Sequence, residues 1–201
     1  MRIFKNILKS EKSKDLEIVS NPKVIFDKEI SVSQLTLSGH RIGDSVNNLN
    51  IASIDMTGLE TYPEKTESRV WKDGKSYVII DGKEIEFTLS ERIKAVVMSG
   101  GWLGYKDGSR FRIKDQIIDS FSLHQDRLSA YTGLSKTKLI KELGKNVETR
   151  ETYEEYDGTL FNTDILNFER QISITWDDWD NEISVICIGD LVKEKVDNNT
   201  V

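Results

Sequence analysis

Residues 165–188 read ILNFERQISITWDDWDNEISVICI, and this stretch contains three apolar runs separated by polar turns. The middle run, Ile172–Trp176, alternates strictly between apolar and polar residues, which is typical of a β-strand with one buried face. The turn Asp177–Asn181 leads from it to the third run, Ile183–Ile188. This spacing predicts a three-stranded antiparallel meander near the C-terminal end of the chain.

A similar meander is expected earlier in the chain. The runs Ser76–Ile80 and Ile85–Leu89 are rich in β-forming residues and lie on either side of Asp81-Gly82. An Asp-Gly pair suits the type I′ turn of a hairpin, because that turn needs positive φ angles at both central positions. We predict that the next apolar run, Ile93–Met98, forms the third strand.

A candidate helix precedes each meander. Ser135 can cap a helix that ends at Gly144, and Ile42–Leu49 is a poorer version of the same pattern. The helices and the meanders repeat at an offset of about 90 residues, which indicates a tandem duplication. The predicted fold class is α+β, with two tandem helix-then-antiparallel-meander units whose sheets could be separate or merged. The expected segments are an N-terminal helix and linker (1–30), a first unit (31–105), a second unit (106–191) and a polar tail (192–201).

Four further segments have simpler interpretations. The apolar residues of Val24–Phe26 and Ile30–Leu37 suggest one or two strands. The Gly-rich segment Ser99–Tyr105 is interpreted as a flexible loop between the units, and four apolar residues within Ile113–Leu128 could line one face of a helix. The charged tail Lys193–Val201 is expected to fray.

Composition narrows the possible functions. The chain has 201 residues, a net charge of −6 and one cysteine, Cys187, which its apolar neighbours place in a buried strand. A single cysteine cannot form an internal disulfide, so the usage favours a reducing cytoplasm. The acidic charge argues against nucleic acid as a partner. No apolar run approaches the ~18 residues of a membrane span, and we predict a cytoplasmic protein.

Short segments around the helices carry a resemblance to a known superfamily. They are Leu134-Ser135-Lys136-Thr137, Leu143-Gly144-Lys145 and, more loosely, Ile42-Gly43-Asp44-Ser45. The arrangement resembles the tandem modules of the β-lactamase inhibitory protein and outer-membrane assembly lipoprotein superfamily. The resemblance implies a protein-binding module whose sheet clamps a partner. The chain departs from that pattern because it has no Pro after the Leu-Gly corner, no cysteine near its start and no exported N-terminus.

The familiar catalytic motifs do not occur. The two histidines, His40 and His124, are not in a zinc-binding spacing, and no Gly-x-Ser-x-Gly sequence is present. The segment 99–105 lacks the residues of a phosphate-binding loop. The lysines of Lys136–Lys141 form a basic patch that we interpret as a solvated helix face. We therefore expect no catalytic residue, no cofactor and no resident metal.

The densest acidic segment is the turn at Asp177, Asp178, Trp179 and Asp180. A calcium-binding loop needs a Gly at its bend, and this segment has none. It also contains a Trp, whose side chain cannot be a calcium ligand. It can be a solvated hairpin turn, or an acidic and aromatic contact surface for a basic protein, since Trp is enriched at interface hot spots. We place the predicted partner-binding residues here, together with Trp102 and Tyr105 of the Gly-rich segment.

These observations lead to two functional hypotheses. The first is a non-enzymatic protein-binding module, specifically an immunity-type inhibitor that masks a toxin or enzyme. Its negative charge would speed association with a basic partner. The alternative is a divalent-metal-dependent enzyme whose carboxylate site, built from residues such as Asp177 and Asp180, forms only in the folded chain. The sequence does not indicate an oligomeric state.

Overall fold

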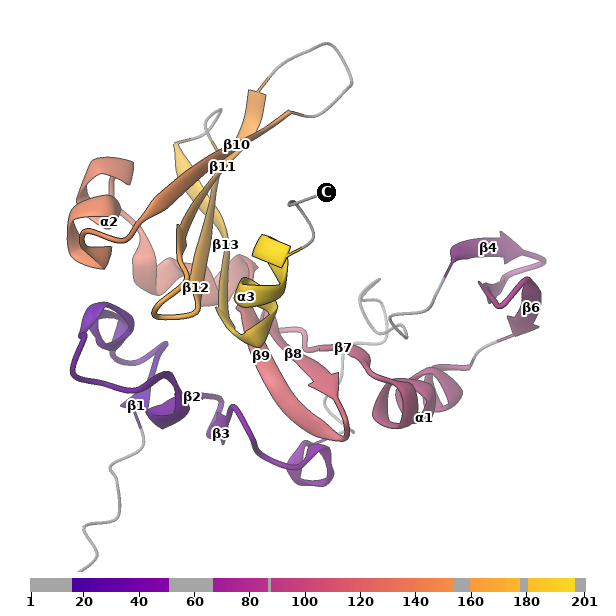
Figure 1. Ribbon diagram of the computed structural model, residues 1–201. Helices are drawn as coiled ribbons and strands as arrows, with labels where there is room; N and C mark the ends of the chain where they lie inside the picture. Colours follow the sequence, from indigo (N-terminus) through magenta and orange to yellow (C-terminus); the bar gives the residue numbers. More distant parts are fainter. Residues whose placement is uncertain (1–15, 51–66, 87, 154–159, 178–180, 198–201) are drawn as a thin grey trace, which may run out of the picture.

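The computed structural model describes residues 16–50, 67–86, 88–153, 160–177 and 181–197. Strands in these ranges form a seven-stranded sheet and two three-stranded sheets (Figure 1). The large antiparallel sheet has the order β10-β11-β12-β13-β9-β8-β7. Its strands are β7 (Gly101–Gly104), β8 (Ser109–Lys114), β9 (Ile117–Leu123), β10 (Glu148–Tyr153), β11 (Leu160–Asn167), β12 (Ile172–Asp177) and β13 (Glu182–Gly189).

One face of this sheet carries the hydrophobic core. The pairing register puts Phe111, Phe121 and Ile188 in one row across β8, β9 and β13, and all three are buried. Rings of Phe111 and Phe121 meet edge-on, with centroids 5.7 Å apart. Burial of such side chains is the main stabilising contribution to a fold of this size.

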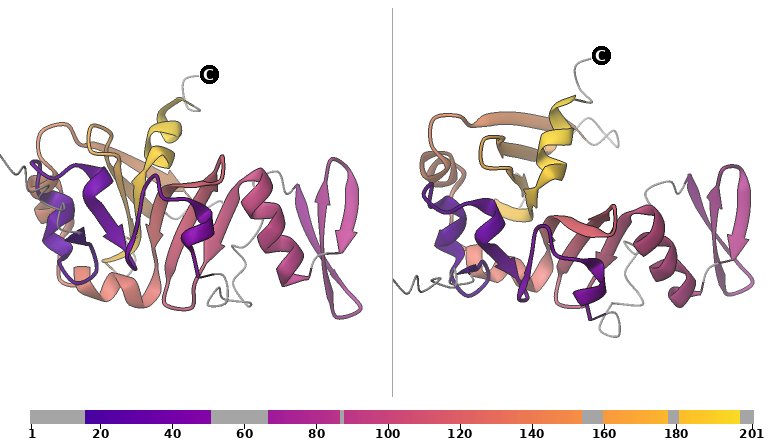
Figure 2. Two further views of the ribbon diagram at one scale, coloured as in Figure 1. Left: turned by 90° about the horizontal axis from the view of Figure 1, so that it is seen from below. Right: turned by 60° about the horizontal axis from the view of Figure 1, so that its bottom comes forward.

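The N-terminal part of the chain covers this apolar face. It contains β1 (Leu16–Glu17), β2 (Leu35–Leu37) and β3 (His40–Arg41), which form a small sheet, and the 3-10 helices η1 (Pro22–Phe26), η2 (Val32–Gln34) and η3 (Val46–Asn48). Ile18, Ile25 and Leu37 belong to the same buried cluster as the sheet residues. Figure 2 shows this indigo-to-purple segment lying along one side of the large sheet.

Two more elements pack around the core. The 3-10 segment η5 (Gln125–Tyr131) and helix α2 (Lys136–Leu143) follow β9, and both contribute to the buried cluster. Ser135 caps α2 as predicted, because its hydroxyl accepts a hydrogen bond from Lys138 N, and Gly144 ends the helix with a φ of 94°. Helix α3 (Asp190–Asp197) contacts the opposite, polar face, where Leu191 N donates to Ser120 Oγ at 2.9 Å.

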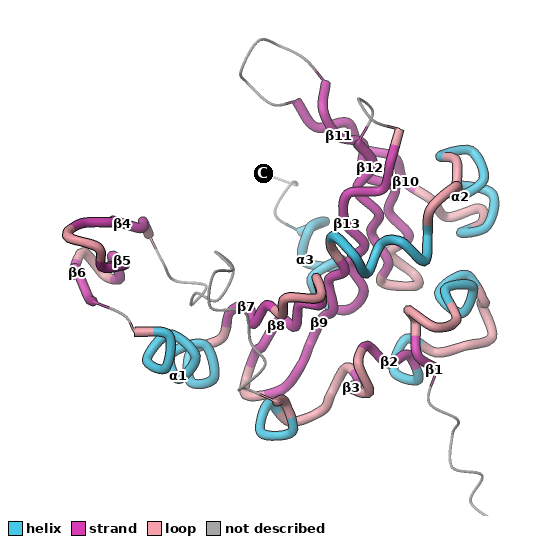
Figure 3. Tube along the Cα trace, turned by 180° about the vertical axis from the view of Figure 1, so that it is seen from behind, coloured by secondary structure: helices cyan, strands magenta, loops and turns pink. Residues whose placement is uncertain are grey.

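The third sheet stands apart from the main body, at the far end of helix α1 (Figures 1 and 3). Its strands are β4 (Ser68–Lys72), β5 (Lys75–Ile80) and β6 (Lys83–Glu86). Cross-strand pairs of opposite charge support it: Lys75 Nζ lies 2.8 Å from Glu86, and Lys72 pairs with Glu84. The carboxylate of Glu67 accepts hydrogen bonds from Gly82 N in the Asp81-Gly82 turn.

Several predictions are confirmed. The C-terminal meander forms β11, β12 and β13, the Asp81-Gly82 hairpin joins β5 to β6, and Cys187 is buried in β13. The chain is α+β. The sheets that the sequence left free to merge are separate.

The prediction of a strand at Ile93–Met98 is wrong, because this run lies in helix α1 (Leu89–Ser99). Thr88 and Glu91 form a capping box at its start: Thr88 N donates to the Glu91 carboxylate at 2.9 Å, and Glu91 N donates to Thr88 Oγ1. Ile93 and Val96 are three residues apart and both buried, so the run has helical periodicity.

The helix face predicted within Ile113–Leu128 is also wrong. These residues form the β8–β9 hairpin and η5. Asp115 and Gln116 adopt positive φ angles of 51° and 62°, so this turn has the backbone of a tight hairpin without any glycine. The segment 99–105, predicted as a loop, contains strand β7.

Other local predictions also differ from the structure. Val24–Phe26 belongs to η1 rather than a strand, Ile42–Leu49 forms only the short turn η3, and the tail begins with α3. The observed elements therefore do not form two equivalent units, since only the second meander joins the large sheet. The boundary predicted at 105/106 falls inside the β7–β8 hairpin. The N-terminal helix predicted over Ile3–Leu8 lies outside the described residues.

Candidate functional site

A groove of about 610 Å³ opens beside the acidic turn that the sequence singled out. We call it the acidic groove. One wall comes from η5 and the loop after it, and the other from the first residues of β13. The lining residues are Asp126, Leu128, Ser129, Tyr131, Thr132, Gly133, Leu134, Asn181, Glu182, Ile183 and Ser184. Its volume is in the range of ligand-binding clefts.

The η5 wall is held rigidly against the N-terminal segment. The hydroxyl of Tyr131 donates to the carbonyl of Ile18 at 2.9 Å, and Tyr131 is buried. Burial raises the pKa of Tyr131, and so does the nearby charge of Glu17. The phenol therefore stays neutral and keeps this anchoring hydrogen bond at physiological pH.

A basic side chain next to the groove is already neutralised. The guanidinium of Arg127 pairs with Asp107 and donates to Ser109 Oγ at 3.0 Å and Ser38 Oγ at 3.1 Å. Burial acts to raise the pKa of Asp107, but hydrogen bonds from Ser109 and Arg127 outweigh it and the pKa lies below its ordinary value. Arg127 is thus committed to joining three segments and does not offset the charge of its neighbour Asp126.

The groove itself is acidic. Asp126 and Glu182 are its only charged lining residues, and both are exposed. Neither carboxylate has a hydrogen bond or ion pair with any residue that the structure describes. Glu182 also lies opposite Asp177 in the strand register, and like charges in this position repel one another. The site therefore offers negative charge to an incoming cationic group.

The rest of the groove surface combines hydroxyls with apolar carbon. Ser129 and Thr132 use their hydroxyl protons within η5, donating to the carbonyls of Asp126 and Ser129 at 2.7 and 2.5 Å. Their oxygens can still accept hydrogen bonds. Leu128, Leu134 and Ile183 pack against the buried cluster and give the groove an apolar floor. This combination suits a Lys or Arg side chain, which has an apolar stem and a charged tip.

The structure separates the predicted binding residues. Asp177 ends β12 at the edge of the acidic groove, while Asp178, Trp179 and Asp180 lie outside the described residues. Trp102 is in β7, four strands away in the sheet order, which is roughly 19 Å at the usual strand spacing. The structure does not bring Trp102 to the acidic turn.

Tyr105 lies in a different environment from the one predicted. Its ring meets the ring of Phe111 edge-on, with centroids 5.5 Å apart. Its hydroxyl is enclosed without a hydrogen-bond partner in the described part of the chain. Burial raises the pKa of Tyr105 to about 12, and the charge of Asp107 acts in the same direction. Tyr105 is thus a packing residue at the margin of the core.

The polar face of the large sheet holds a second group of reactive residue types. Ser122 Oγ lies 2.6 Å from Nε2 of His124 and 3.6 Å from Sγ of Cys187. Burial lowers the pKa of His124 to about 4, helped by the charge of Arg110, so its imidazole is neutral at pH 7. Ser122 is only 2% exposed. These contacts give the buried polar groups on this face hydrogen-bond partners.

A buried ion pair lies on the same face. Arg112 Nε donates to both carboxylate oxygens of Asp119 at 2.9 and 3.0 Å, and Nη2 donates at 2.6 Å. The side chains are 2% and 5% exposed. The pairing register shifts next to Arg112, which turns Asp119 towards the guanidinium. This pair is a structural feature that sequence analysis missed.

The described residues do not form a candidate metal site. Among the residues that the structure describes, no group of three or more His, Cys, Asp or Glu side chains could hold a metal ion. The described helices also include none that is long and apolar enough to cross a membrane.

Asp126 lines the groove but is not among the binding residues predicted from the sequence. It lies within Ile113–Leu128, a segment that the sequence suggests could be a helix. No family model matches the chain, and no match was found among curated proteins or solved structures.

Proposed function

We propose that this chain is a non-enzymatic protein-binding module. Its acidic groove would receive a basic side chain of the partner protein. The observation that carries this proposal is the groove of about 610 Å³ with Asp126 and Glu182 as its only charged lining residues. Arg fits such a site well, because its guanidinium can bond a carboxylate through two parallel hydrogen bonds. The apolar floor of Leu128, Leu134 and Ile183 would contact the stem of the side chain.

The charge of the whole chain supports the same type of partner. A net charge of −6 accelerates encounter with a basic protein and slows encounter with an acidic one. The specific form of the proposal is a cytoplasmic immunity-type inhibitor that masks the site of a basic toxin or enzyme. The resemblance to the β-lactamase inhibitory protein superfamily favours the same class of function. Asp177, Asp178, Trp179 and Asp180 would extend the contact surface beyond the groove.

Affinity purification with the full chain as bait tests the proposal. The wild type is compared with Asp126→Asn/Glu182→Gln, which removes both carboxylates of the groove. Glu29→Gln/Glu142→Gln is the matched control, since it removes the same number of charges from exposed positions outside the groove. A further bait, Trp179→Ala, probes the adjoining turn.

We expect one stoichiometric, basic partner that is lost or strongly depleted with the groove variant and retained with the control. Equal capture by all baits would refute the role of the groove. Equal loss of the partner with the control variant would show that capture depends only on the net charge of the bait. If purified bait retains no partner above background at either low or physiological salt, the protein-binding proposal fails.

A further inference from the structure

A separate cavity with several cationic lining residues lies where helix α2 ends. We call it the cationic cavity. It has a volume of about 400 Å³, and its lining residues are Lys28, Leu143, Lys145, Asn146, Asn167, Glu169 and Arg170. Three separate segments meet here: the loop after η1, the end of α2 and the turn between β11 and β12. None of these residues lines the acidic groove.

The cavity contains three cations and one carboxylate. Lys28 and Lys145 are exposed, and neither has a hydrogen bond or ion pair with a described residue. Glu169 is the only acidic lining residue. The lining therefore carries a charge excess of two positive units in a chain whose net charge is −6. Such a local reversal of charge is expected at a site for an anion.

Arg170 differs from the two lysines because one of its donor atoms is enclosed. Its Nη2 donates to the carbonyl of Ile30 at 3.1 Å, whereas its Nη1 is enclosed and has no hydrogen-bond partner in the described part of the chain. Burial acts to lower the pKa of Arg170, and the charge of Asp27 opposes this effect. A guanidinium stays charged in proteins. Arg170 therefore keeps a permanent positive charge at the wall of the cavity.

Hydrogen bonds of the Asn167 side chain hold two walls of the cavity together. Asn167 is buried, and its side-chain amide donates to the carbonyl of Leu143 at 2.8 Å while its oxygen accepts from Arg170 N at 3.1 Å. These two bonds tie the β11–β12 turn to the last turn of α2. Gly144 has a φ of 94°, a conformation that favours glycine, and the flexible end of the Lys28 side chain lies close to it.

The number and type of donors indicate the ligand. A guanidinium and two ammonium groups at one cavity suit a doubly charged tetrahedral oxyanion, because Arg contributes directed hydrogen bonds and Lys contributes point charges. We propose that the cationic cavity binds a phosphate group of a small molecule. A cavity of about 400 Å³ is large enough for a phosphate and a modest organic group attached to it.

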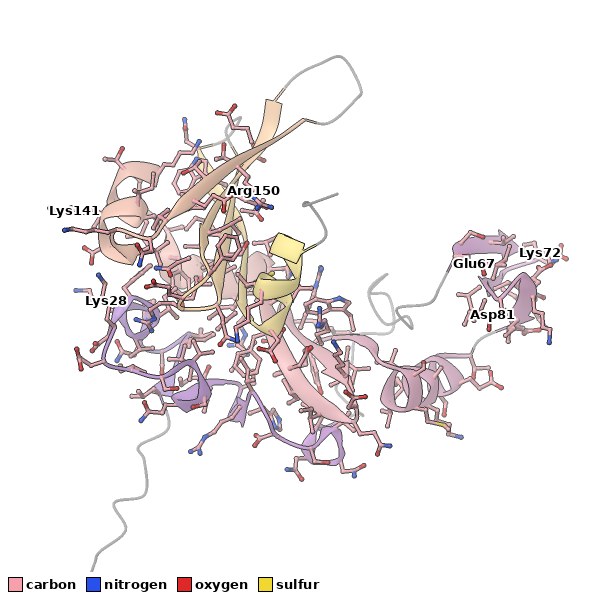
Figure 4. All side chains as sticks on the ribbon, viewed as in Figure 1. Lys28, Glu67, Lys72, Asp81, Lys141 and Arg150 are labelled. Carbon is pink, nitrogen blue, oxygen red and sulfur yellow. The ribbon has the colours of Figure 1, made fainter. Side chains whose placement is uncertain are left out.

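Two-dimensional NMR of the full chain, titrated with inorganic phosphate at constant ionic strength, tests this proposal. The variant Lys28→Gln/Lys145→Gln removes two cavity cations at exposed positions. The matched control is Lys138→Gln/Lys141→Gln, which removes two lysines from α2 that do not line the cavity. Figure 4 shows Lys28 and Lys141 at the same end of the molecule, so the control lowers the positive charge of that region by the same amount as the cavity variant.

The expected result is saturable binding, with the largest amide shifts at Leu143, Lys145 and Arg170. Affinity should fall at least tenfold in the cavity variant and no more than about twofold in the control. Non-saturable shifts, or equal weakening in both variants, would overturn the proposal by showing general charge attraction. A cavity variant that loses thermal stability without changing phosphate affinity would show that the lysines only complement the C-terminal end of α2.

Discussion

Replacement of Asp119 by Ala should be one of the most destabilising single substitutions in the large sheet. The carboxylate of Asp119 accepts hydrogen bonds from Nε and Nη2 of Arg112 at 2.6 to 3.0 Å. Both side chains are almost fully enclosed. Truncation would take from the buried guanidinium the carboxylate that accepts three of its hydrogen bonds, and breaking a buried pair in this way costs about 3–5 kcal/mol.

That cost is a large share of the 5–15 kcal/mol that typically separates folded and unfolded states. For a chain of this length it corresponds to a fall of about 6–20 °C in Tm. Urea unfolding followed by circular dichroism measures the loss directly, with Glu29→Ala as a control at an exposed carboxylate. The double variant Arg112→Met/Asp119→Leu removes both charges together and should recover most of the lost stability, because apolar residues of similar volume replace the pair.

A loss below about 1 kcal/mol for Asp119→Ala would refute this reasoning, since that is the range of an exposed ion pair. A double variant that is much less stable than Asp119→Ala would also contradict it. In that case the pair would contribute net stability beyond compensating for its own burial.

Three further predictions follow from local geometry. Gly189→Ala should destabilise the sheet strongly, because the new methyl group would collide with the Asp119 carbonyl; Gly39→Ala, with open space around it, should cost only the strain of its positive φ, and thermal unfolding compares the two. The low pKa of His124, about 4, means that the unfolded state binds more protons between pH 4 and 6.5. This contribution to stability is therefore complete above pH 6.5 and lost as the pH falls towards 4; His124→Gln should flatten the pH dependence of the urea midpoint in that window. Tyr105→Phe removes an enclosed hydroxyl that has no hydrogen-bond partner among the described residues, so its Tm should equal or exceed that of the wild type, and a fall of several degrees would contradict the assigned environment.

Strong local signals in the sequence predicted the parts of the fold that they specify. The strict alternation of Ile172–Trp176 gave the correct strand, and the Asp81-Gly82 turn gave the correct hairpin. The second strand of that hairpin is Lys83–Glu86 instead of the predicted Ile85–Leu89, because Leu89 already belongs to α1. Ser135 and Gly144 correctly bounded α2. In each case the residues that define the element lie within it or beside it, so no distant contact is needed to select the structure.

The errors arose in short apolar runs whose residue spacing is compatible with either a helix or a strand. The run Ile93–Met98 contains β-branched residues that would suit a strand. The capping box of Thr88 and Glu91 instead starts a helix that includes this run. The β8–β9 hairpin turns at Asp115-Gln116, which lacks the glycine that usually marks such a turn. Without that hairpin, the large sheet could not be assembled from the sequence.

The site was predictable only in part. The acidic turn precedes one wall of the groove: Glu182 lines the groove, and Asp177 lies opposite Glu182 in the strand register. Asp126 on the opposite wall depends on the path of η5, and Trp102 is separated from the turn by the order of the strands. The cations Lys28, Lys145 and Arg170 come from distant parts of the chain, and no sequence spacing relates them.

Hydrogen–deuterium exchange of the chain, alone and bound to its captured partner, is the most direct test of the proposed function. Binding is expected to protect the two walls of the acidic groove, residues 126–134 and 181–184. Protection should be absent from the same segments when Asp126→Asn/Glu182→Gln is mixed with the partner at the same concentration. Protection confined to other elements, with both walls unchanged, would contradict the proposal that a basic partner docks in this groove.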